Sequence, residues 1–367
     1  MNSERWIYSR LKRDNLFLTF DYDLSSNLTF FSDVLYYKSD TIQNNSPSAA
    51  FSTSRIIVPA NNYWNPFGPV NFNDGRANPN RVRLNNTGQD ISQTIPDDGL
   101  PILIDWYRYV DVGPRVVNVE KDTYRFLFGL RGASKNWRWE TAIFTSKANT
   151  DDITSNRLSN SLVEEALSLS TPDAYNPFNG GGNYINYLSS GNDGTPSTNS
   201  SIKNAIIDVY RKGERKLNSF DFKITNDSIL SIESGKISFA GGLEFRSDKF
   251  TDDRDPRLDG TIKYIDKDGD TYPFVSDVMN SSPTPDNSGK RDVFSAYAEF
   301  LVPLISEEMN LFFAKSMNLQ IAGRFEDFSD VGSKSVPKIA IGWEVNKNLF
   351  IRGSLSKGFR VPNLVQI

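Results

Sequence analysis

The stretch LQIAGRFEDFSDVGSKSVPKIAIGWEVNKNLFIRGSLS (Leu319–Ser356) contains the pattern that decides the fold. It has three runs in which apolar residues alternate with polar or charged ones, and the short links Asp330–Ser335 and Asn346–Asn348 separate these runs. Side chains that repeat every second residue lie on one face of a β-strand. The stretch therefore predicts three antiparallel strands in succession, each with one apolar face and one polar face.

The same alternation recurs through most of the chain, whereas helical periodicity is almost absent. One helix-like stretch, Ser159–Ser170, predicts a short helix within a loop. We expect an all-β, antiparallel protein. Its ten predicted strands are Arg13–Leu24, Asn27–Thr41, Asp105–Gly132, Trp137–Asn149, Gly213–Thr225, Lys236–Phe250, Asp292–Leu304, Met317–Ser329, Val336–Val345 and Leu349–Arg360.

Composition excludes several kinds of site and partner. The chain of 367 residues has no Cys and no His, so it contains no disulfide, no thiolate zinc site and no Ser-His or Cys-His nucleophile pair. Its net charge of −4 argues against a nucleic-acid partner, which would need a basic face. No cofactor is expected. No run of about eighteen apolar residues is present, so a transmembrane helix is not expected either.

The connections between strands distinguish a soluble sandwich from a membrane barrel, since both show the same alternation along each strand. Short links occur at Asp23–Ser26 and Ala133–Asn136. Long polar insertions, Ile42–Leu103, Thr150–Lys212 and Thr251–Lys290, alternate with them. Three loops of this length are unusual in a soluble domain. One link on the long-loop side, Asp330–Ser335, is itself short. Short turns at one end and mostly long loops at the other predict an outer-membrane β-barrel with long extracellular loops.

Several motifs carry a family resemblance. GRFEDFSDVGSKSVPKIAIGWEVNKNLFIRGSLSKGFRVPNL (Gly323–Leu364) resembles the mid-barrel segment of TonB-dependent outer-membrane receptors. FAGGLEFRSDKF (Phe239–Phe250) and SAYAEFLVPL (Ser295–Leu304) look like preceding barrel strands. AYNPFNGG (Ala174–Gly181), echoed by YWNPFGP (Tyr63–Pro69), is similar to extracellular loop motifs of one subgroup.

The resemblance implies a location in the outer membrane of a Gram-negative bacterium, where lipid is one partner. It also implies a barrel of about 22 strands around an N-terminal plug domain, preceded by a segment that contacts the TonB complex. The ten strands expected here are fewer than that, and no plug is recognised. Residues 1–367 are therefore expected to be the central part of such a barrel, without the plug domain or the remaining strands.

The resemblance implies uptake of a scarce large ligand, energised through TonB. The ligand classes are siderophores, cobalamin and oligosaccharides, and the absence of His slightly disfavours haem. A passive porin-type barrel without a plug is the alternative function. An enzyme is not expected, although a soluble carbohydrate-active enzyme stays open as a distant third possibility.

Charged residues on the polar face of the predicted strands are expected to line the lumen and to contact the plug. Paired carboxylates of this kind also serve glycosidases, but alternation places these residues on the wall of a barrel rather than in a cleft. The lumen-facing residues are Arg131, Glu244, Arg246, Glu299, Arg324, Glu326, Arg352 and Arg360.

Aromatic residues at two loop tips are candidate ligand contacts. Each tip has an Asn-Pro-Phe sequence, in which Pro restricts the backbone and fixes the direction of the ring that follows. The candidates are Trp64 and Phe67 in the first loop, and Tyr175 and Phe178 in the second. The alternative is that these rings pack the loops against each other.

Three acidic residues are spaced like part of a calcium loop: Asp266, Asp268 and Asp270. An EF-hand that starts at Asp266 would need Gly at Thr271 and Glu at Asp277, and neither position fits. A polar turn at a loop tip is the favoured interpretation, and no metal site is assigned.

Overall fold

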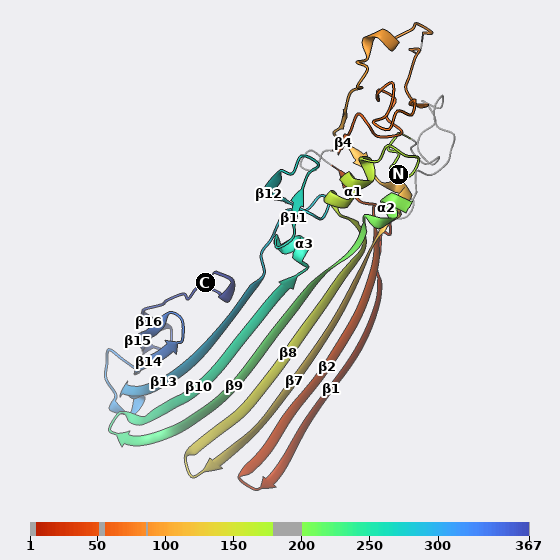
Figure 1. Cartoon of the computed structure of the whole chain (residues 1–367). Helices are drawn as coiled ribbons and strands as arrows, with labels where there is room; N and C mark the ends of the chain where they lie inside the picture. The colour runs from red at the N-terminus through yellow and green to blue at the C-terminus, as the bar shows by residue number, and fades with distance from the viewer. Residues whose placement is uncertain (1–4, 51–55, 86, 179–199, 367) are drawn as a thin grey trace.

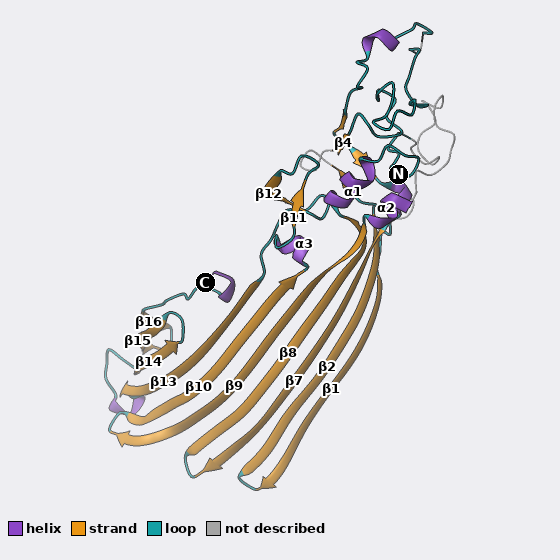
Figure 2. Cartoon of the chain, in the orientation of Figure 1, coloured by secondary structure: helices purple, strands orange, loops and turns teal. Residues whose placement is uncertain are grey.

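One large antiparallel sheet dominates the computed structural model, which describes residues 5–50, 56–85, 87–178 and 200–366 (Figures 1 and 2). The sheet has ten strands, and their order in the sheet is their order in the chain. The predictions of an all-β, antiparallel fold and of ten strands are confirmed. The strands are β1 (Arg10–Ser25), β2 (Leu28–Asn45), β7 (Arg115–Ser134), β8 (Trp137–Leu158), β9 (Ile206–Ile232), β10 (Gly235–Arg254), β13 (Asn287–Ile305), β14 (Ser316–Phe328), β15 (Gly332–Asn346) and β16 (Leu349–Ser356).

The expected strand Asp105–Gly132 is wrong at its beginning, because β7 begins only at Arg115. Gly113, at φ +90°, and Pro114 interrupt the extended chain just before it. Proline cannot donate to a strand ladder, and the left-handed region favours glycine. Residues 105–114 belong instead to the first long loop, where Tyr107–Arg108 forms the short strand β6.

Other strand limits also differ from the expected ones. The last strand ends at Ser356, so Arg360 lies beyond it. At the long-loop end, β8 and β9 extend past the predicted limits Asn149 and Gly213. Residues 150–158 are mostly polar on both faces of the strand, and they therefore show no alternation that a prediction can detect.

The register places apolar side chains of neighbouring strands in line on one face of the sheet. Ile143 lies opposite Phe128 on β7 and Phe220 on β9. Phe245 lies opposite Phe220 and Phe294, and its ring centroid is 4.9 Å from that of Phe294. We call this face the apolar face. Ile143 is 58% exposed and Phe245 is 51% exposed on it.

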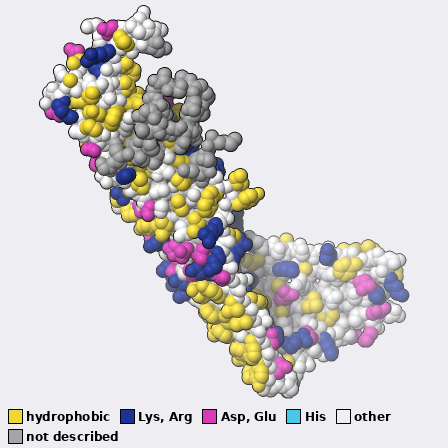
Figure 3. All heavy atoms as spheres, turned by 90° about the vertical axis from the view of Figure 1, so that its right-hand side faces the viewer, with side chains coloured by type: hydrophobic (Ala, Val, Ile, Leu, Met, Phe, Trp, Pro, Cys, Tyr) yellow, Lys and Arg dark blue, Asp and Glu magenta, His cyan; other side chains and the backbone are white. Residues whose placement is uncertain are grey.

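Nothing in the described part of the chain covers the apolar face, since the other sheets there are two-stranded and lie in the loops. A soluble sandwich would pack a second sheet against it. Viewed from the side of β1, a patch of hydrophobic side chains lies below a band of charged ones (Figure 3). This arrangement agrees with the expected membrane barrel. No helix of the described residues is long and apolar enough to span a membrane.

The two edges of the sheet are β1 and β16, each of which has one neighbouring strand. All residues of β1 and of β16 are exposed, because the second side of each strand is unpaired among the described residues. The sheet curves (Figure 1) but does not close into a barrel.

The long loops carry the remaining elements, and most of them gather at one end of the sheet (Figure 1). The predicted loop helix is confirmed as α1 (Asn160–Leu167), and Ser159 caps it by accepting a hydrogen bond from the Leu162 N–H at 3.2 Å. The elements are β3 (Ala49–Ala50) with β6, β4 (Ile56–Val58) with β5 (Ile102–Ile104), α1 (Asn160–Leu167), α2 (Ser200–Asn204), α3 (Pro256–Asp259), and β11 (Lys263–Ile265) with β12 (Thr271–Ser276). Short 3-10 turns lie at Ser92–Thr94, Val110–Val112, Glu307–Met309 and Leu364–Gln366.

Candidate functional site

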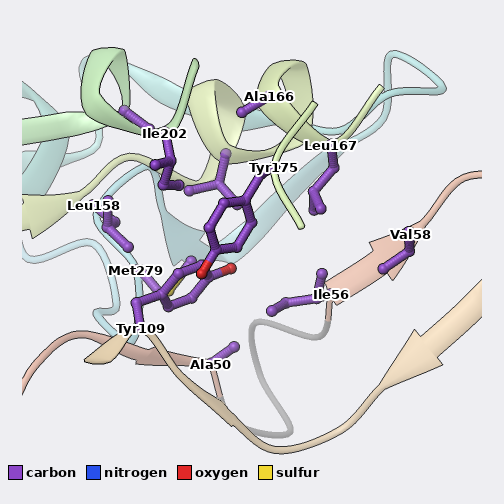
Figure 4. Packing of buried hydrophobic residues seen from close by; sticks show 12 residues of the cluster. Ala50, Ile56, Val58, Tyr109, Leu158, Ala166, Leu167, Tyr175, Ile202 and Met279 are labelled. Carbon is purple, nitrogen blue, oxygen red and sulfur yellow. The ribbon is translucent and has the colours of Figure 1, made fainter. Parts of the chain in front are cut away.

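The first and second long loops form one packed unit above the sheet. We call the described residues of 46–114 and 159–205 the loop platform. Its apolar core includes side chains from both loops, and Tyr109 and Tyr175 are fully buried in it (Figure 4). Their rings stack with centroids 5.5 Å apart, and the Tyr175 hydroxyl is 2.9 Å from that of Tyr107. Among the described residues, this buried hydrophobic cluster therefore lies mainly in the loops, and Leu158 at the end of β8 is its contribution from the sheet.

Hydrogen bonds between the two loops hold the platform together. The fully buried Asn62 side chain donates to the carbonyl oxygens of Leu167 and Tyr175, at 2.7 and 3.2 Å. The Trp64 indole donates to the Ala174 carbonyl at 2.9 Å. Partners more than one hundred residues apart thus fix the relative position of the two loops.

Each Asn-Pro-Phe tip is a turn that its own asparagine closes. The Asn65 side-chain oxygen accepts from the Phe67 N–H at 2.8 Å, and the Asn176 oxygen accepts from the Phe178 N–H at 3.0 Å. Such Asx turns mimic backbone turns and hold the following residue in place. Phe67 is 39% exposed and Phe178 is 38% exposed.

The structure divides the four aromatic candidates into two pairs. Phe67 and Phe178 present their rings to solvent at the tips. Trp64 is half-buried and hydrogen-bonded to the neighbouring loop, and Tyr175 is enclosed in the platform core. The second pair therefore packs the loops against each other, as the alternative interpretation describes, while the rings of the first pair stay exposed at the tips.

The expected lumen-facing residues that lie on strands share the face opposite the apolar face, and several of them form an ion-pair network. Arg324 lies at its centre, 2.8 Å from Glu326 and 3.5 Å from Glu244. Glu244 also pairs with Arg246 at 3.4 Å. The Ser295 hydroxyl, directly opposite Glu244 in the sheet, donates to Glu326 at 3.3 Å. These charges compensate one another along the polar face of β10, β13 and β14.

The other lumen-facing candidates lie outside this network. Arg131 pairs with Asp21 and lies over the Phe31 ring, 5.4 Å from its centroid. Glu299 accepts a hydrogen bond from Gln320. Arg352 is exposed on the edge strand β16. Arg360 follows the end of that strand, so its prediction as a strand residue is wrong.

Residues 96–367, more than half of the chain, match the family model described as "TonB dependent receptor-like, beta-barrel". The chain belongs to the TonB-dependent receptor-like β-barrel family. The resemblance inferred from Gly323–Leu364 is therefore confirmed.

Two solved structures are similar to this receptor barrel. The FpvAI–pyocin S2 complex shares 11% identity over 92% of this chain and 35% of that one, with a TM-score of 0.45. The outer membrane transporter YddB from Escherichia coli shares 9% identity over 91% of this chain and 36% of that one, with a TM-score of 0.32. The chain thus spans about a third of the length of each. No curated protein matches it.

The acidic stretch in the third loop of this receptor barrel is arranged as a turn. The Asp266 carboxylate accepts from the N–H groups of Asp268 and Asp270, at 2.9 and 2.8 Å, and from the Tyr272 hydroxyl at 2.7 Å. The bond from Tyr272 is the main cause that lowers the pKa of Asp266, while it raises the pKa of Tyr272 to about 12. The Asp268 carboxylate pairs with Lys267 at 2.7 Å. Among the described residues, no three acidic side chains converge to hold a metal ion.

Sequence reasoning missed the residues that organise the platform. Asn62, Tyr107 and Tyr109 lie in loop segments without periodicity, so no pattern marks them. The one available signal was the Tyr-Trp-Asn-Pro-Phe run beside Asn62, whose aromatic density is high for a polar loop.

Proposed function

We propose that this chain forms the ligand-gathering mouth and part of the wall of an outer-membrane uptake receptor in a Gram-negative bacterium. The observation that carries the proposal is the loop platform, in which two long loops pack at one end of a sheet and present Phe67 and Phe178 to solvent. Binding sites in barrels form at the mouth, where loop side chains converge. Membership of the TonB-dependent receptor-like family supports an energised receptor rather than a porin.

The two unpaired edge strands support the proposal that this sheet is part of a larger, closed barrel. Unpaired backbone groups are costly in lipid, so a sheet that spans a membrane must close. In our proposal the closed barrel holds a plug domain against the polar face, where Arg352 and the Arg324 network supply charged contacts. The TonB complex is the proposed energy source, acting through a segment outside these 367 residues.

An enzymatic role is not proposed. Carboxylates that act in glycoside hydrolysis flank an open site in which one acid serves as proton donor. Glu326 and Glu244 both lie within ion-pairing distance of the same arginine, Arg324, so neither is set apart for that task. Their position on a strand wall suits a polar channel lining.

The proposed ligand is a siderophore, a cobalamin or an oligosaccharide. These ligands are too large for a narrow pore, and exposed aromatic rings stack on sugar and ring systems of this size. Phe67 and Phe178 are the residues we assign to this contact, while Trp64 and Tyr175 hold the platform that positions them.

The proposal is tested by measuring ligand uptake in cells in which the full-length receptor is the only copy of this protein. The probes are a ferric hydroxamate, a ferric catecholate, cyanocobalamin and maltoheptaose, each with and without a protonophore. We expect one probe to enter only with energy, and we expect F67A/F178A to weaken its binding about tenfold or more, since an aromatic stack contributes on the order of 1 kcal/mol per ring beyond its buried area.

The matched control is Phe312→Ala, which removes a ring that is 99% exposed in the turn at the opposite end of the sheet. It should leave binding unchanged. W64A/Y175A should lose binding together with protease resistance of the loops. Uptake that persists with the protonophore would favour the porin, and unchanged binding by F67A/F178A would remove the tips from the ligand site.

A further inference from the structure

Four lysines from four consecutive strands stand in one line on the apolar face of the sheet. Lys147 on β8 lies opposite Lys216 on β9, Lys216 opposite Lys249 on β10, and Lys249 opposite Lys290 on β13. All four side chains are exposed. With neighbouring strands about 4.8 Å apart, the line is about 14 Å long. We call these four residues the lysine row.

The lysine row borders the apolar part of this face. Along each strand toward the short turns, the next residue on the same face is polar and the one after it is apolar. The polar residues are Thr145, Asn218, Ser247 and Asp292, and the apolar ones are Ile143, Phe220, Phe245 and Phe294. The row therefore lies where a lipid headgroup would meet the protein if the apolar residues contact acyl chains.

The two central lysines of the row make no ion pair of their own, although the Glu214 carboxylate that pairs with Lys147 also attracts them. Lys147 pairs with Glu214 and Lys290 with Asp292, both at 2.8 Å. Among the residues that the structure describes, no carboxylate lies within ion-pairing distance of Lys216 or Lys249. Like charges directly opposite each other in a sheet destabilise it. A bound anion would remove this cost.

The neighbouring strands show that the sheet can avoid this cost. On the same face of β1 and β2, Lys12 lies opposite Asp40 and Asp14 lies opposite Lys38. On β7, Asp122 lies opposite Lys38. Opposite charges thus alternate along the line Asp14, Lys38 and Asp122. In the next line along these strands Asp40 lies opposite both Lys12 and Glu120. Positive charges alone face one another along the lysine row.

A groove opens on the apolar face beside the row. Its volume is about 780 Å³, and its walls include Thr145, Asn218 and Ser247 from the polar line. Its apolar lining consists mainly of Phe126, Phe128, Ile143, Phe220, Phe245 and Phe294. Cations at the rim of an apolar groove match a molecule that has an anionic head and hydrocarbon chains.

We propose that the lysine row binds the phosphate of an outer-leaflet lipid whose acyl chains lie in this groove. Lysine binds phosphate as a point charge, and adjacent lysines about 5 Å apart can both reach one phosphate group. The long aliphatic stems of the lysines let their ammonium groups reach the headgroup level. The proposal rests on the outer-membrane location proposed above, but it does not depend on which ligand the loops capture.

Lipid binding by the full-length receptor, purified from outer membranes in detergent, tests the proposal by native mass spectrometry. The probes are bisphosphorylated lipid A, its dephosphorylated form and inorganic phosphate. The test variant is K216Q/K249Q. The matched control is K12Q/K38Q, which removes the same charge from the same face, but from lysines that lie opposite aspartates.

We expect wild type to retain lipid A in preference to the other two probes. K216Q/K249Q should bind it about tenfold to thirtyfold more weakly, given the contribution of two lysines near a charged membrane surface. K12Q/K38Q should bind as wild type does, and K216R/K249R should restore binding. Ligand uptake by the receptor is measured in parallel, so that a failure of the proposed function can be distinguished from a failure of lipid binding.

Three outcomes would overturn the proposal. One is lipid A binding by K216Q/K249Q at the wild-type level. Another is an equal loss of lipid A binding in K12Q/K38Q, which would show that the effect depends only on net charge. The third is equal retention of dephosphorylated lipid A by wild type, which would leave the lysine row without a role. A shift of apparent mass on heating shows whether each variant barrel is folded.

Discussion

Replacing Asn62 with Ala should loosen the loop platform without affecting the sheet. Asn62 is fully buried, and its side chain makes three hydrogen bonds inside the platform. It donates to the carbonyl oxygens of Leu167 and Tyr175, and it accepts from the Trp64 N–H at 2.9 Å. Alanine makes none of these bonds, and two carbonyls and one N–H lose a partner in a dry environment.

The expected size of the effect follows from these three bonds. A buried hydrogen bond contributes about 1 kcal/mol net, so the loss amounts to about 3 kcal/mol. Since 1.4 kcal/mol is a factor of ten, the platform should open about a hundredfold more often. Two of the lost bonds join the two loops, the third lies within the first loop, and none reaches the strands of the large sheet, so the sheet should keep its stability.

Hydrogen exchange of the full-length receptor, resolved by peptide, measures this opening directly. In N62A, amides of α1 and of residues 59–68 should exchange about a hundredfold faster, while those of β8 and β9 stay protected. Asn61→Ala is the control, because Asn61 lies next in the chain and makes one exposed bond, 3.3 Å long, to the Ser168 carbonyl. Equal exchange in N61A and N62A would refute the reasoning, as would faster exchange throughout the sheet.

Two further predictions concern the sheet. Arg291 holds the Asp330 carboxylate through hydrogen bonds of 2.7 to 2.9 Å and lowers the pKa of Asp330 below its ordinary value of 3.8. Because the pKa of Asp330 is depressed in the folded state, this contact should stabilise the β14–β15 turn above about pH 4, and the stabilisation should be lost as the pH falls through the folded-state pKa. Hydrogen exchange of the amides of residues 328–332 should show this loss in wild type but not in D330N. The 367-residue chain expressed alone should need detergent, since its unpaired edges and apolar face are exposed, and a soluble, monodisperse monomer in gel filtration would contradict the membrane interpretation.

Local pattern in the sequence was enough to predict the sheet. Alternation has a period of two residues and does not depend on distant contacts, so the ten strands and their polar and apolar faces follow from the order of residues alone. The short helix expected within Ser159–Ser170 was predictable because helical periodicity is also a local pattern, and the structure has it at Asn160–Leu167. Gly323–Leu364 indicated the family, which the match over residues 96–367 bears out.

Only the tertiary structure decided which charged and aromatic residues meet. Sequence reasoning grouped Trp64, Phe67, Tyr175 and Phe178, yet the packing of two loops buries Tyr175 and leaves both phenylalanines exposed. The lysine row is likewise invisible in the chain, where Lys147 and Lys290 are far apart. A shift of one residue in any of three strand pairings would turn a lysine to the other face, and register depends on all the contacts of the strand at once. Faces can thus be deduced from local sequence, whereas the alignment of residues across strands and between loops follows from non-local packing.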